Sequence, residues 1–373
     1  MRFMLAVILA LAAALFAAAP ASSAQSRVPE GWLGVTLDGP FDAGKEREWN
    51  RIVAAGAESV RTAVRWYHFQ PYRSSADVPE SDAARFRDVG GVPTDFSRMD
   101  ELVAAAAQRG LSVLPVVLAP PDWAVAKPGV IGARPRNPAT FARFMTGLVG
   151  RYGPRGSLWA EQPQLPRVPI REWQIWNEPN LTSYWSRQPF ARTFVRMLRA
   201  ASAAVRAADG GATIVLAGLT NKSWKALRSI YRAGGRGNFD AVALHPFTRK
   251  PADVLRLVRL ARGVMARYGD GRLPVWVTEL SWPAAKGKVR KRNRTGFEVT
   301  NAVQARNMGL VLRLLARERR RLRIERVVWY TWLSAESGQN PFNWSGLRRL
   351  RKGSVVDTPA LRAFRRAARA LRG

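Results

Sequence analysis

Eight alternations between a short β-rich run and an amphipathic helical stretch constrain the fold more than any other feature of this sequence. The β-rich runs contain much Val, Ile, Leu and Trp and are almost continuously hydrophobic, as expected for strands that are covered on both faces. They occupy residues 32–39, 58–64, 111–120, 171–178, 212–218, 240–246, 273–280 and 325–333.

The stretches between these runs place apolar residues at every third or fourth position, which is typical of helices packed against a sheet. The clearest are residues 96–110, 138–153, 251–269, 301–320 and 358–372. Repeated strand–helix units produce parallel strands with right-handed crossovers. Eight of them predict an α/β protein with a closed (β/α)8 TIM barrel. A doubly wound open sheet is the alternative, but no glycine-rich phosphate loop follows the first strand.

The first 24 residues have the layout of a secretory signal peptide: a basic start at Arg2, an apolar run over residues 3–19, and small residues up to Ala24. An uncleaved membrane anchor is the alternative, because the run approaches the length that spans a bilayer. We predict a signal peptide at residues 1–24 and one barrel domain at residues 25–373, in a protein that is secreted or associated with the cell envelope. No later segment is apolar enough for a stable membrane span.

The cysteine and histidine content narrows the chemistry. The chain has no cysteine and only two histidines, His68 and His245. Thiol nucleophiles, cysteine-ligated metals and a three-histidine metal site are therefore excluded, and a serine–histidine triad has few options. Carboxylate chemistry remains, and we expect neither a metal nor an organic cofactor.

Two glutamates stand at equivalent places in the predicted barrel. Glu178 ends the fourth strand within the sequence WNEPN, and Glu279, 101 residues later, ends the seventh within VTEL. The carboxyl ends of barrel strands meet at one face, where such proteins assemble their active sites. The alternative for Glu178 alone is a cap of the following helix, and the alternative for Glu279 alone is a pair with an arginine. Because both acids occupy matching strand ends, we predict that they converge across the barrel mouth.

Two converging carboxyl groups among tryptophans suit the cleavage of a glycosidic bond. One acid must be protonated to donate to the leaving oxygen, and the other must be ionised to attack the sugar or to activate water. An aromatic wall beside Glu178 favours its neutral form. A separation of ~5 to 5.5 Å between the two carboxyl groups would make the second one a nucleophile, with retention of anomeric configuration.

These segments resemble clan A of the retaining glycoside hydrolases, closest to its family 39-like branch and with some likeness to family 5. The likeness spans nearly all of residues 31–335: besides the two glutamate segments it includes VRTAVRWYHFQP at the second strand, ALHPF at the sixth and VVWYTW at the eighth. The Asn-Glu-Pro sequence is a specific sign of this clan when it closes a fourth strand. It becomes a strong one when a glutamate such as Glu279 also stands at the end of the seventh strand.

The resemblance implies a role for each matching position. Glu178 would be the acid/base and Glu279 the nucleophile. Asn177 would hydrogen-bond the sugar 2-hydroxyl, and Arg61 would orient Glu279 and help to keep it ionised. His245 would contact the acid/base region, although Pro-Phe replaces the tyrosine that often follows this histidine in the family.

The resemblance also implies an aromatic floor under the sugar, formed by Trp332 or else by Trp329. Trp123, Trp185 and Trp282 fall in loops after strands three, four and seven, on the same rim. Rings at such places can stack on sugar faces. Burial in the core is the alternative for each of them.

The formal charge of +33 favours an anionic partner such as an acidic polysaccharide, an envelope polymer or nucleic acid. A general excess of arginine in the source genome is the alternative. Residues 286–294, KGKVRKRNR, lie in the loop directly after Glu279, so we expect this basic run to attract an acidic glycan. No nucleic-acid-binding module is recognised, and no nucleic acid is expected as a partner.

The sequence therefore predicts a secreted, monomeric retaining glycoside hydrolase. We expect it to cleave O-glycosidic bonds of the β type in a polysaccharide or oligosaccharide. Two rival functions remain open: a non-catalytic glycan-binding barrel of the cell envelope, and a transglycosylase on the same scaffold.

Overall fold

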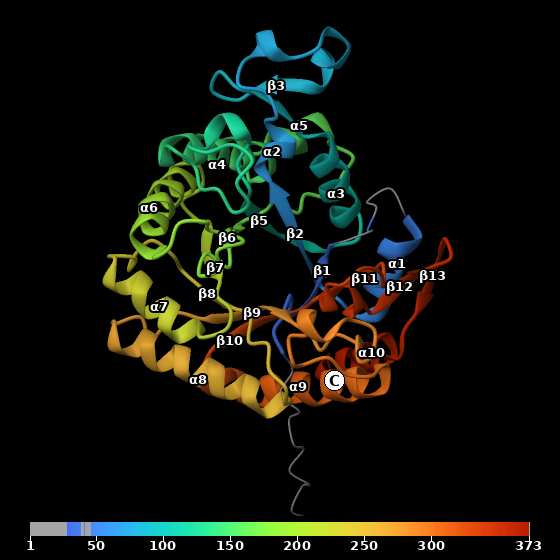
Figure 1. Ribbon diagram of the computed structural model, residues 1–373. Helices are drawn as coiled ribbons and strands as arrows, with labels where there is room; N and C mark the ends of the chain where they lie inside the picture. The colour runs from blue at the N-terminus through green and yellow to red at the C-terminus, as the bar shows by residue number, and fades with distance from the viewer. Residues whose placement is uncertain (1–27, 39–40, 42–45, 373) are drawn as a thin grey trace, which may run out of the picture.

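A barrel of eight parallel strands forms the centre of the computed structural model, which describes residues 28–38, 41 and 46–372 (Figure 1). The predicted signal peptide, residues 1–24, lies outside the described residues. The barrel strands are β1 (Leu33–Leu37), β2 (Ser59–Arg65), β5 (Ser112–Leu118), β6 (Glu172–Asn177), β7 (Thr213–Gly218), β8 (Val242–Leu244), β9 (Val275–Leu280) and β10 (Ile324–Trp329).

The strands are hydrogen-bonded in the order β7-β6-β5-β2-β1-β10-β9-β8. Two parallel bridges, Val215 to Ala241 and Leu219 to Leu244, bring the outer strands β7 and β8 together and close the barrel. Each strand overlaps one of the eight runs that the sequence analysis selected. The predicted (β/α)8 barrel is confirmed.

Helices surround the barrel and cover its outer face (Figure 1). Their apolar sides are buried against the strands, as the helical periodicity required. They are α1 (Glu46–Ala55), α2 (Trp66–Phe69), α3 (Ser97–Ala107), α4 (Pro138–Tyr152), α5 (Ser157–Glu161), α6 (Ala191–Ala208), α7 (Ser223–Arg232), α8 (Pro251–Arg267), α9 (Asn301–Leu322) and α10 (Pro359–Arg372). No helix in the described part of the chain combines the length and the apolar character that crossing a membrane requires.

Two small sheets outside the barrel were not predicted. One is the antiparallel pair β3 (Phe86–Asp88) and β4 (Pro93–Asp95), which projects from the barrel (Figure 1). The other joins β11 (Leu333–Ser334), β12 (Arg348–Arg351) and β13 (Ser354–Asp357), directly after the last barrel strand. Both are made of strands of two to four residues, too short to show a periodicity in the sequence.

A buried ion pair fastens the three-stranded sheet to the barrel. Glu48 of α1, 4% exposed, forms an ion pair with Arg348 of β12, which is 2% exposed. Its second carboxylate oxygen accepts a hydrogen bond from the indole Nε1 of Trp332 at 3.1 Å. Removing one partner of a buried pair leaves the other charge without compensation.

We expect Glu48→Gln to lower the free energy of unfolding by on the order of 3 kcal/mol, measured by urea denaturation. The matched control is Glu46→Gln on the same helix, whose carboxylate is 80% exposed and lies 3.3 Å from Arg109. That exposed pair is worth less than about 1 kcal/mol. Equal losses in the two variants would contradict the role given to Glu48.

Candidate active site

Glu178 follows the last residue of β6 and turns its carboxyl group into a cavity at the carboxyl end of the barrel. Its backbone has φ 40°, and Trp176, two residues earlier, has φ 73°. Residues other than glycine seldom adopt such left-handed conformations, and those that do cluster at functional sites. The strained turn holds Glu178 nearly buried, at 9% exposure.

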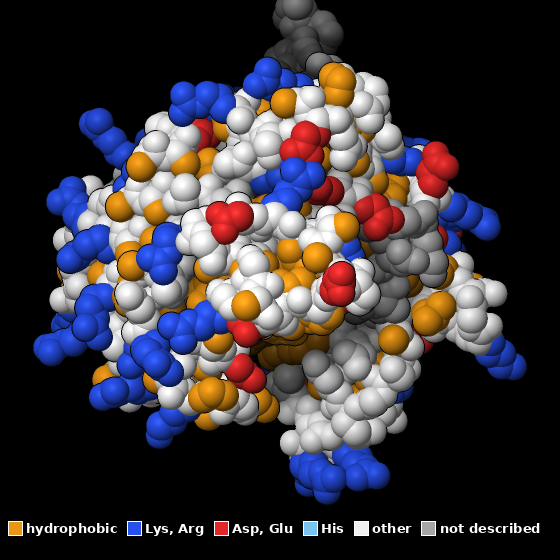
Figure 2. Space-filling model, turned by 90° about the horizontal axis from the view of Figure 1, so that it is seen from above, with side chains coloured by type: hydrophobic (Ala, Val, Ile, Leu, Met, Phe, Trp, Pro, Cys, Tyr) orange, Lys and Arg blue, Asp and Glu red, His pale blue; other side chains and the backbone are white. Residues whose placement is uncertain are grey.

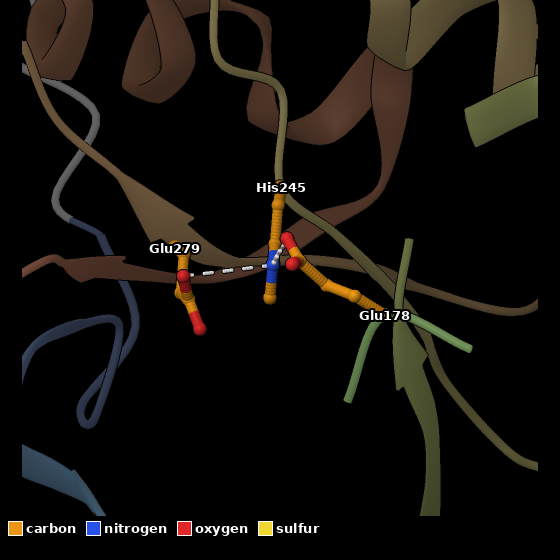
Figure 3. Close-up of side chains that lie close together, drawn as sticks. All are labelled: Glu178, His245 and Glu279. Atoms are coloured by element: carbon orange, nitrogen blue, oxygen red, sulfur yellow. Dashed lines mark hydrogen bonds and ion pairs between the residues drawn. The ribbon is translucent and has the colours of Figure 1, made fainter. Parts of the chain in front are cut away.

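Glu279 lies near the end of β9 and reaches the same cavity from a different part of the barrel wall. Oxygens of Glu178 and Glu279 and a ring nitrogen of His245 all lie within 4.8 Å of one another (Figure 3). The structure thus brings together the two glutamates that the spacing of the strands predicted.

Arg61 of β2 links the residues of the site through all three of its guanidinium nitrogens. Nη1 donates to Glu279 Oε1 at 2.8 Å, Nη2 to Asn177 Oδ1 at 2.9 Å, and Nε to Gln174 Oε1 at 3.1 Å. The side chain is only 4% exposed. The expected pairing of Arg61 with Glu279 is present. Gln174 was missed, although a glutamine within the apolar run of β6 is the signal that could have identified it.

His245 follows β8 and contacts Glu178, as the resemblance implied. Its Nδ1 lies 2.8 Å from Glu178 Oε1 and 3.6 Å from Glu279 Oε2, and its Nε2 lies 3.1 Å from the Thr278 hydroxyl. The ring is 1% exposed and does not line the cavity. Its burial and its absence from the cavity lining do not favour a direct contact between His245 and a ligand.

Burial shifts the pKa values of Glu178 and His245 in opposite directions. It raises the pKa of Glu178 to about 7, even though the charge of Arg61 and a hydrogen bond from Thr220 act in the opposite direction. Burial also lowers the pKa of His245 to about 4, so the imidazole is neutral at ordinary pH. Glu178 can therefore hold a proton near neutral pH, while Glu279 is paired with a buried guanidinium.

The cavity has a volume of about 620 Å³ and opens between the strand ends. Its size suits a small organic ligand that is mostly enclosed. Aromatic rings make up much of its wall, and they are those of Tyr67, Trp176, Tyr184, Phe247, Phe297, Tyr330 and Phe342.

The tryptophans that the sequence favoured as sugar platforms do not line this cavity. Four of them are buried in the core at no more than 1% exposure; they are Trp185, Trp282, Trp329 and Trp332. Trp123 is half-buried and donates from Nε1 to a backbone carbonyl at 2.8 Å instead of facing the cavity. None of the five rings forms part of the wall of this cavity, because four are packed in the core and Trp123 packs edge-on against Trp66.

Tyr330, which lies between Trp329 and Trp332 in the sequence, does line the cavity. Its hydroxyl donates to Asp38 at 2.9 Å. Beside it, Phe247, Phe297 and Phe342 pack ring against ring at centroid distances of 4.9 to 5.9 Å. This wall comes from three separate loops, which is why no local motif announced it.

The basic run at residues 286–294 lies at the rim of the cavity. Thr295 and Phe297, just after it, line the cavity, whereas the residues of the run do not. Lys288 is partly neutralised by Glu336, 3.9 Å away. Lys and Arg side chains are also spread widely over the face of the molecule that Figure 2 shows.

Among the described residues, Glu178, His245 and Glu279 form the group with a spacing that would suit a metal ion. Arg61 already places a positive charge 2.8 Å from Glu279, however, and His245 Nδ1 lies 2.8 Å from Glu178 Oε1. Both carboxyl groups and the imidazole therefore already have polar partners within the protein.

Comparisons with known proteins identify the fold. No protein-family model matches the chain, and no curated protein matches it either. A family 39 glycoside hydrolase from the gut symbiont Bacteroides cellulosilyticus WH2 is similar in structure with a TM-score of 0.62 and 18% identity, covering 92% of this chain and 64% of that one.

Two further structures give the same result. The GH5_18 protein from Streptomyces cattleya, solved in complex with GlcNAc, has a TM-score of 0.64 and 17% identity, with 92% of this chain and 81% of that chain covered. A monomeric beta-xylosidase from Caulobacter crescentus CB15 has a TM-score of 0.63 and 15% identity, with 91% and 69% covered. This chain therefore shares the barrel fold of family 39 and family 5 glycoside hydrolases, and it spans less than two thirds of the Bacteroides protein's length.

Proposed function

We propose that this chain is an exported, monomeric glycoside hydrolase that cleaves β-linked O-glycosidic bonds with retention of configuration. One observation carries the proposal: two glutamates on separate strands of a barrel present carboxylate oxygens within 4.8 Å of each other in one cavity. The fold shared with glycoside hydrolases of two families supports it.

The first step would form a bond between enzyme and sugar. A Glu279 oxygen attacks the anomeric carbon while Glu178 donates its proton to the glycosidic oxygen, so the leaving group departs as a neutral alcohol and an ester to Glu279 remains. In the second step Glu178, now ionised, takes a proton from water as that water attacks the same carbon. Glu279 leaves and Glu178 is protonated again. Two inversions give net retention, and the short separation of the carboxyl groups favours this path over direct attack by water.

Asn177 would hold the sugar next to the nucleophile. Its Oδ1 accepts from Arg61 at 2.9 Å, which leaves the amide NH2 to donate toward the cavity that Asn177 lines. A donor at this position can bond the 2-hydroxyl of the sugar, an interaction that strengthens in the transition state. Arg61 then fixes the amide and Glu279 in a single geometry.

The raised pKa of Glu178 predicts the basic limb of the pH profile. The acid must be protonated to act, and its pKa is about 7. We therefore expect kcat/KM to fall roughly tenfold per pH unit above that value, as the protonated fraction declines. A pH series with an unactivated glycoside measures this. A flat profile from pH 6 to 9 would exclude Glu178 as the acid.

The basic run at residues 286–294 gives a prediction about substrate charge. Replacing Arg290, Arg292 and Arg294 by glutamate should raise KM for anionic glycans and flatten its dependence on salt, because the run sits on the cavity rim. Neutral glycans of the same length provide the comparison. The matched control is the triple glutamate variant at Arg317, Arg320 and Arg321, which lie at the end of α9. If neutral and acidic glycans respond alike, an acidic substrate is not selected here.

Hydrolysis of a panel of chromogenic glycosides and polysaccharides tests the proposed function. Wild type should turn over at least one β-glycoside, and the first product released should keep the β configuration, measured by NMR. Addition of acceptor sugars distinguishes a transglycosylase, whose products would be longer oligosaccharides. Binding of glycans with no turnover on the whole panel would instead support a non-catalytic glycan-binding barrel.

A further inference from the structure

The imidazole of His245 occupies the space that a side chain on Gly218 would fill. Gly218 is the last residue of β7, and a Cβ atom there would lie 2.0 Å from His245 Nε2 and 2.5 Å from Cε1. Contacts of that length do not occur between unbonded heavy atoms. A residue without a side chain is thus a condition for the ring to lie beside Glu178.

The partners of the two ring nitrogens are of different kinds. Nδ1 faces carboxyl groups on two sides, with Glu178 Oε1 at 2.8 Å and Glu279 Oε2 at 3.6 Å. Nε2 faces the hydroxyl of Thr278 at 3.1 Å, on a residue that is 0% exposed. Carboxylates only accept hydrogen bonds, whereas a hydroxyl can donate or accept.

A neutral imidazole carries one N–H and one lone pair, so these partners select a tautomer. With hydrogen on Nδ1, the ring donates to Glu178, and Nε2 accepts from the Thr278 hydroxyl. With hydrogen on Nε2, the Nδ1 lone pair would face two carboxylate oxygens whenever both glutamates are ionised. Only the first arrangement satisfies every group in that state.

We propose that Gly218 and Thr278 are positioning residues that hold His245 as a neutral Nδ1–H donor to Glu178. Donation to Oε1 leaves the other oxygen, Oε2, as the site of the exchangeable proton of Glu178. The acid proton is thereby kept on one defined oxygen, and His245 takes part without being protonated itself. The effect on rate rests on the proposed function; the tautomer does not.

The charged and titratable groups around the ring come from several elements. They are Glu178 after β6, Glu279 on β9 and Arg61 on β2, with Tyr184 near both carboxyl groups. Arg61 disfavours a charge on the imidazole and Glu279 favours one, while burial is the largest influence and disfavours it. The neutral form therefore persists over the range in which Glu178 titrates.

Nitrogen NMR of the resting protein tests the tautomer without any substrate. The chain has only two histidines, so 15N-histidine labelling gives two ring systems, and His68→Gln assigns them. We expect His245 to show hydrogen on Nδ1 and an imine-type Nε2 from pH 6 to 8. An Nε2–H tautomer or a protonated ring in this range would overturn the proposal.

Variants test the two positioning residues. Thr278→Val should move the Nε2 resonance toward that of an unbonded imine nitrogen and lower kcat/KM roughly 3- to 10-fold, the size of one lost hydrogen bond. Thr278→Ser keeps the hydroxyl and should restore both. An equal loss in the two variants would mean that Thr278 matters only for packing.

Gly218→Ala should displace the ring, lower kcat/KM by about 100-fold and move the basic limb to higher pH, because ionised Glu178 loses a donor. Gly263→Ala is the control, since an added Cβ there meets nothing within 4 Å. Unchanged His245 signals in Gly218→Ala would refute the role of Gly218. If that variant does not fold, the Thr278 pair and the wild-type tautomer still decide.

Activity and NMR together distinguish a failure of the proposed function from a failure of the proposed tautomer. If no glycoside is hydrolysed but Nδ1–H is observed, the proposed function fails and the arrangement of His245 stands. If glycosides are hydrolysed and the Nε2–H tautomer is found, the proposed function stands and the proposed arrangement of His245 fails.

Discussion

Glu279→Ala will reduce the hydrolysis of a β-glycoside by on the order of 10,000-fold or more. The side chain whose oxygen forms the bond to the sugar is then missing, and no other carboxylate replaces it. Glu279 Oε1 accepts from Arg61 at 2.8 Å, so the truncation also leaves a small, positively charged space beside the anomeric carbon. Steady-state kinetics with an activated aryl glycoside measures the loss.

Azide should restore turnover in this variant and report the role of the missing group. An azide ion that fills the space beside Arg61 attacks from the face where Glu279 stood. One displacement then gives a glycosyl azide of inverted configuration, which NMR of the product identifies. A retained product would assign Glu279 to the acid/base role instead.

Glu172→Ala is the matched control for Glu279. Glu172 begins β6, at the opposite end of the barrel, and is paired with Arg326 at 2.6 Å. Its loss removes a glutamate–arginine pair of the same kind without touching the cavity. Rates within a few-fold of wild type are expected for this control, so a large loss there would show that truncation damages the barrel in general.

The barrel and the pair of glutamates could be predicted because both follow from local and periodic features. Parallel strands with both faces covered appear as continuous apolar runs, and their carboxyl ends meet at one face whatever the loops contain. Glu178 and Glu279 were therefore located by their positions at strand ends. Arg61 was placed by a different route, namely the resemblance of its segment to the second strand of the clan A glycoside hydrolases.

The direction of side chains beyond a strand end could not be predicted. Trp329, Tyr330 and Trp332 follow one another closely, and only the fold shows that the tyrosine faces the cavity while both tryptophans are buried. Trp332 is held by a hydrogen bond to Glu48, 284 residues away in the sequence. No local pattern records such a partner.

The residues that support the site were missed for the same reason. Gln174, Gly218 and Thr278 lie on barrel strands, each next to a residue that comes from a different strand. A glycine or threonine within a strand has no special signature in a single sequence. Their importance becomes visible only when the ring of His245 and the guanidinium of Arg61 are placed against them.

Glu178→Ala will affect substrates in proportion to the basicity of their leaving groups. A poor leaving group needs the proton that Glu178 supplies, so its kcat/KM should fall by about 100- to 10,000-fold. A dinitrophenolate departs without protonation, and the first step with such a substrate should change little. The pH dependence above 7 should disappear in the variant, because the group whose pKa is about 7 is gone.

Azide should speed turnover of the activated substrate and give a glycosyl azide of retained configuration, since it enters on the face where Glu178 acted as the base. Glu336→Ala, which lies near the basic run and pairs with Arg349 at 3.4 Å, serves as the control and should lose no leaving-group dependence. If Glu178→Ala lowered the rate equally for good and poor leaving groups, the site would need an acid other than Glu178, and its burial beside His245 would have only a structural meaning.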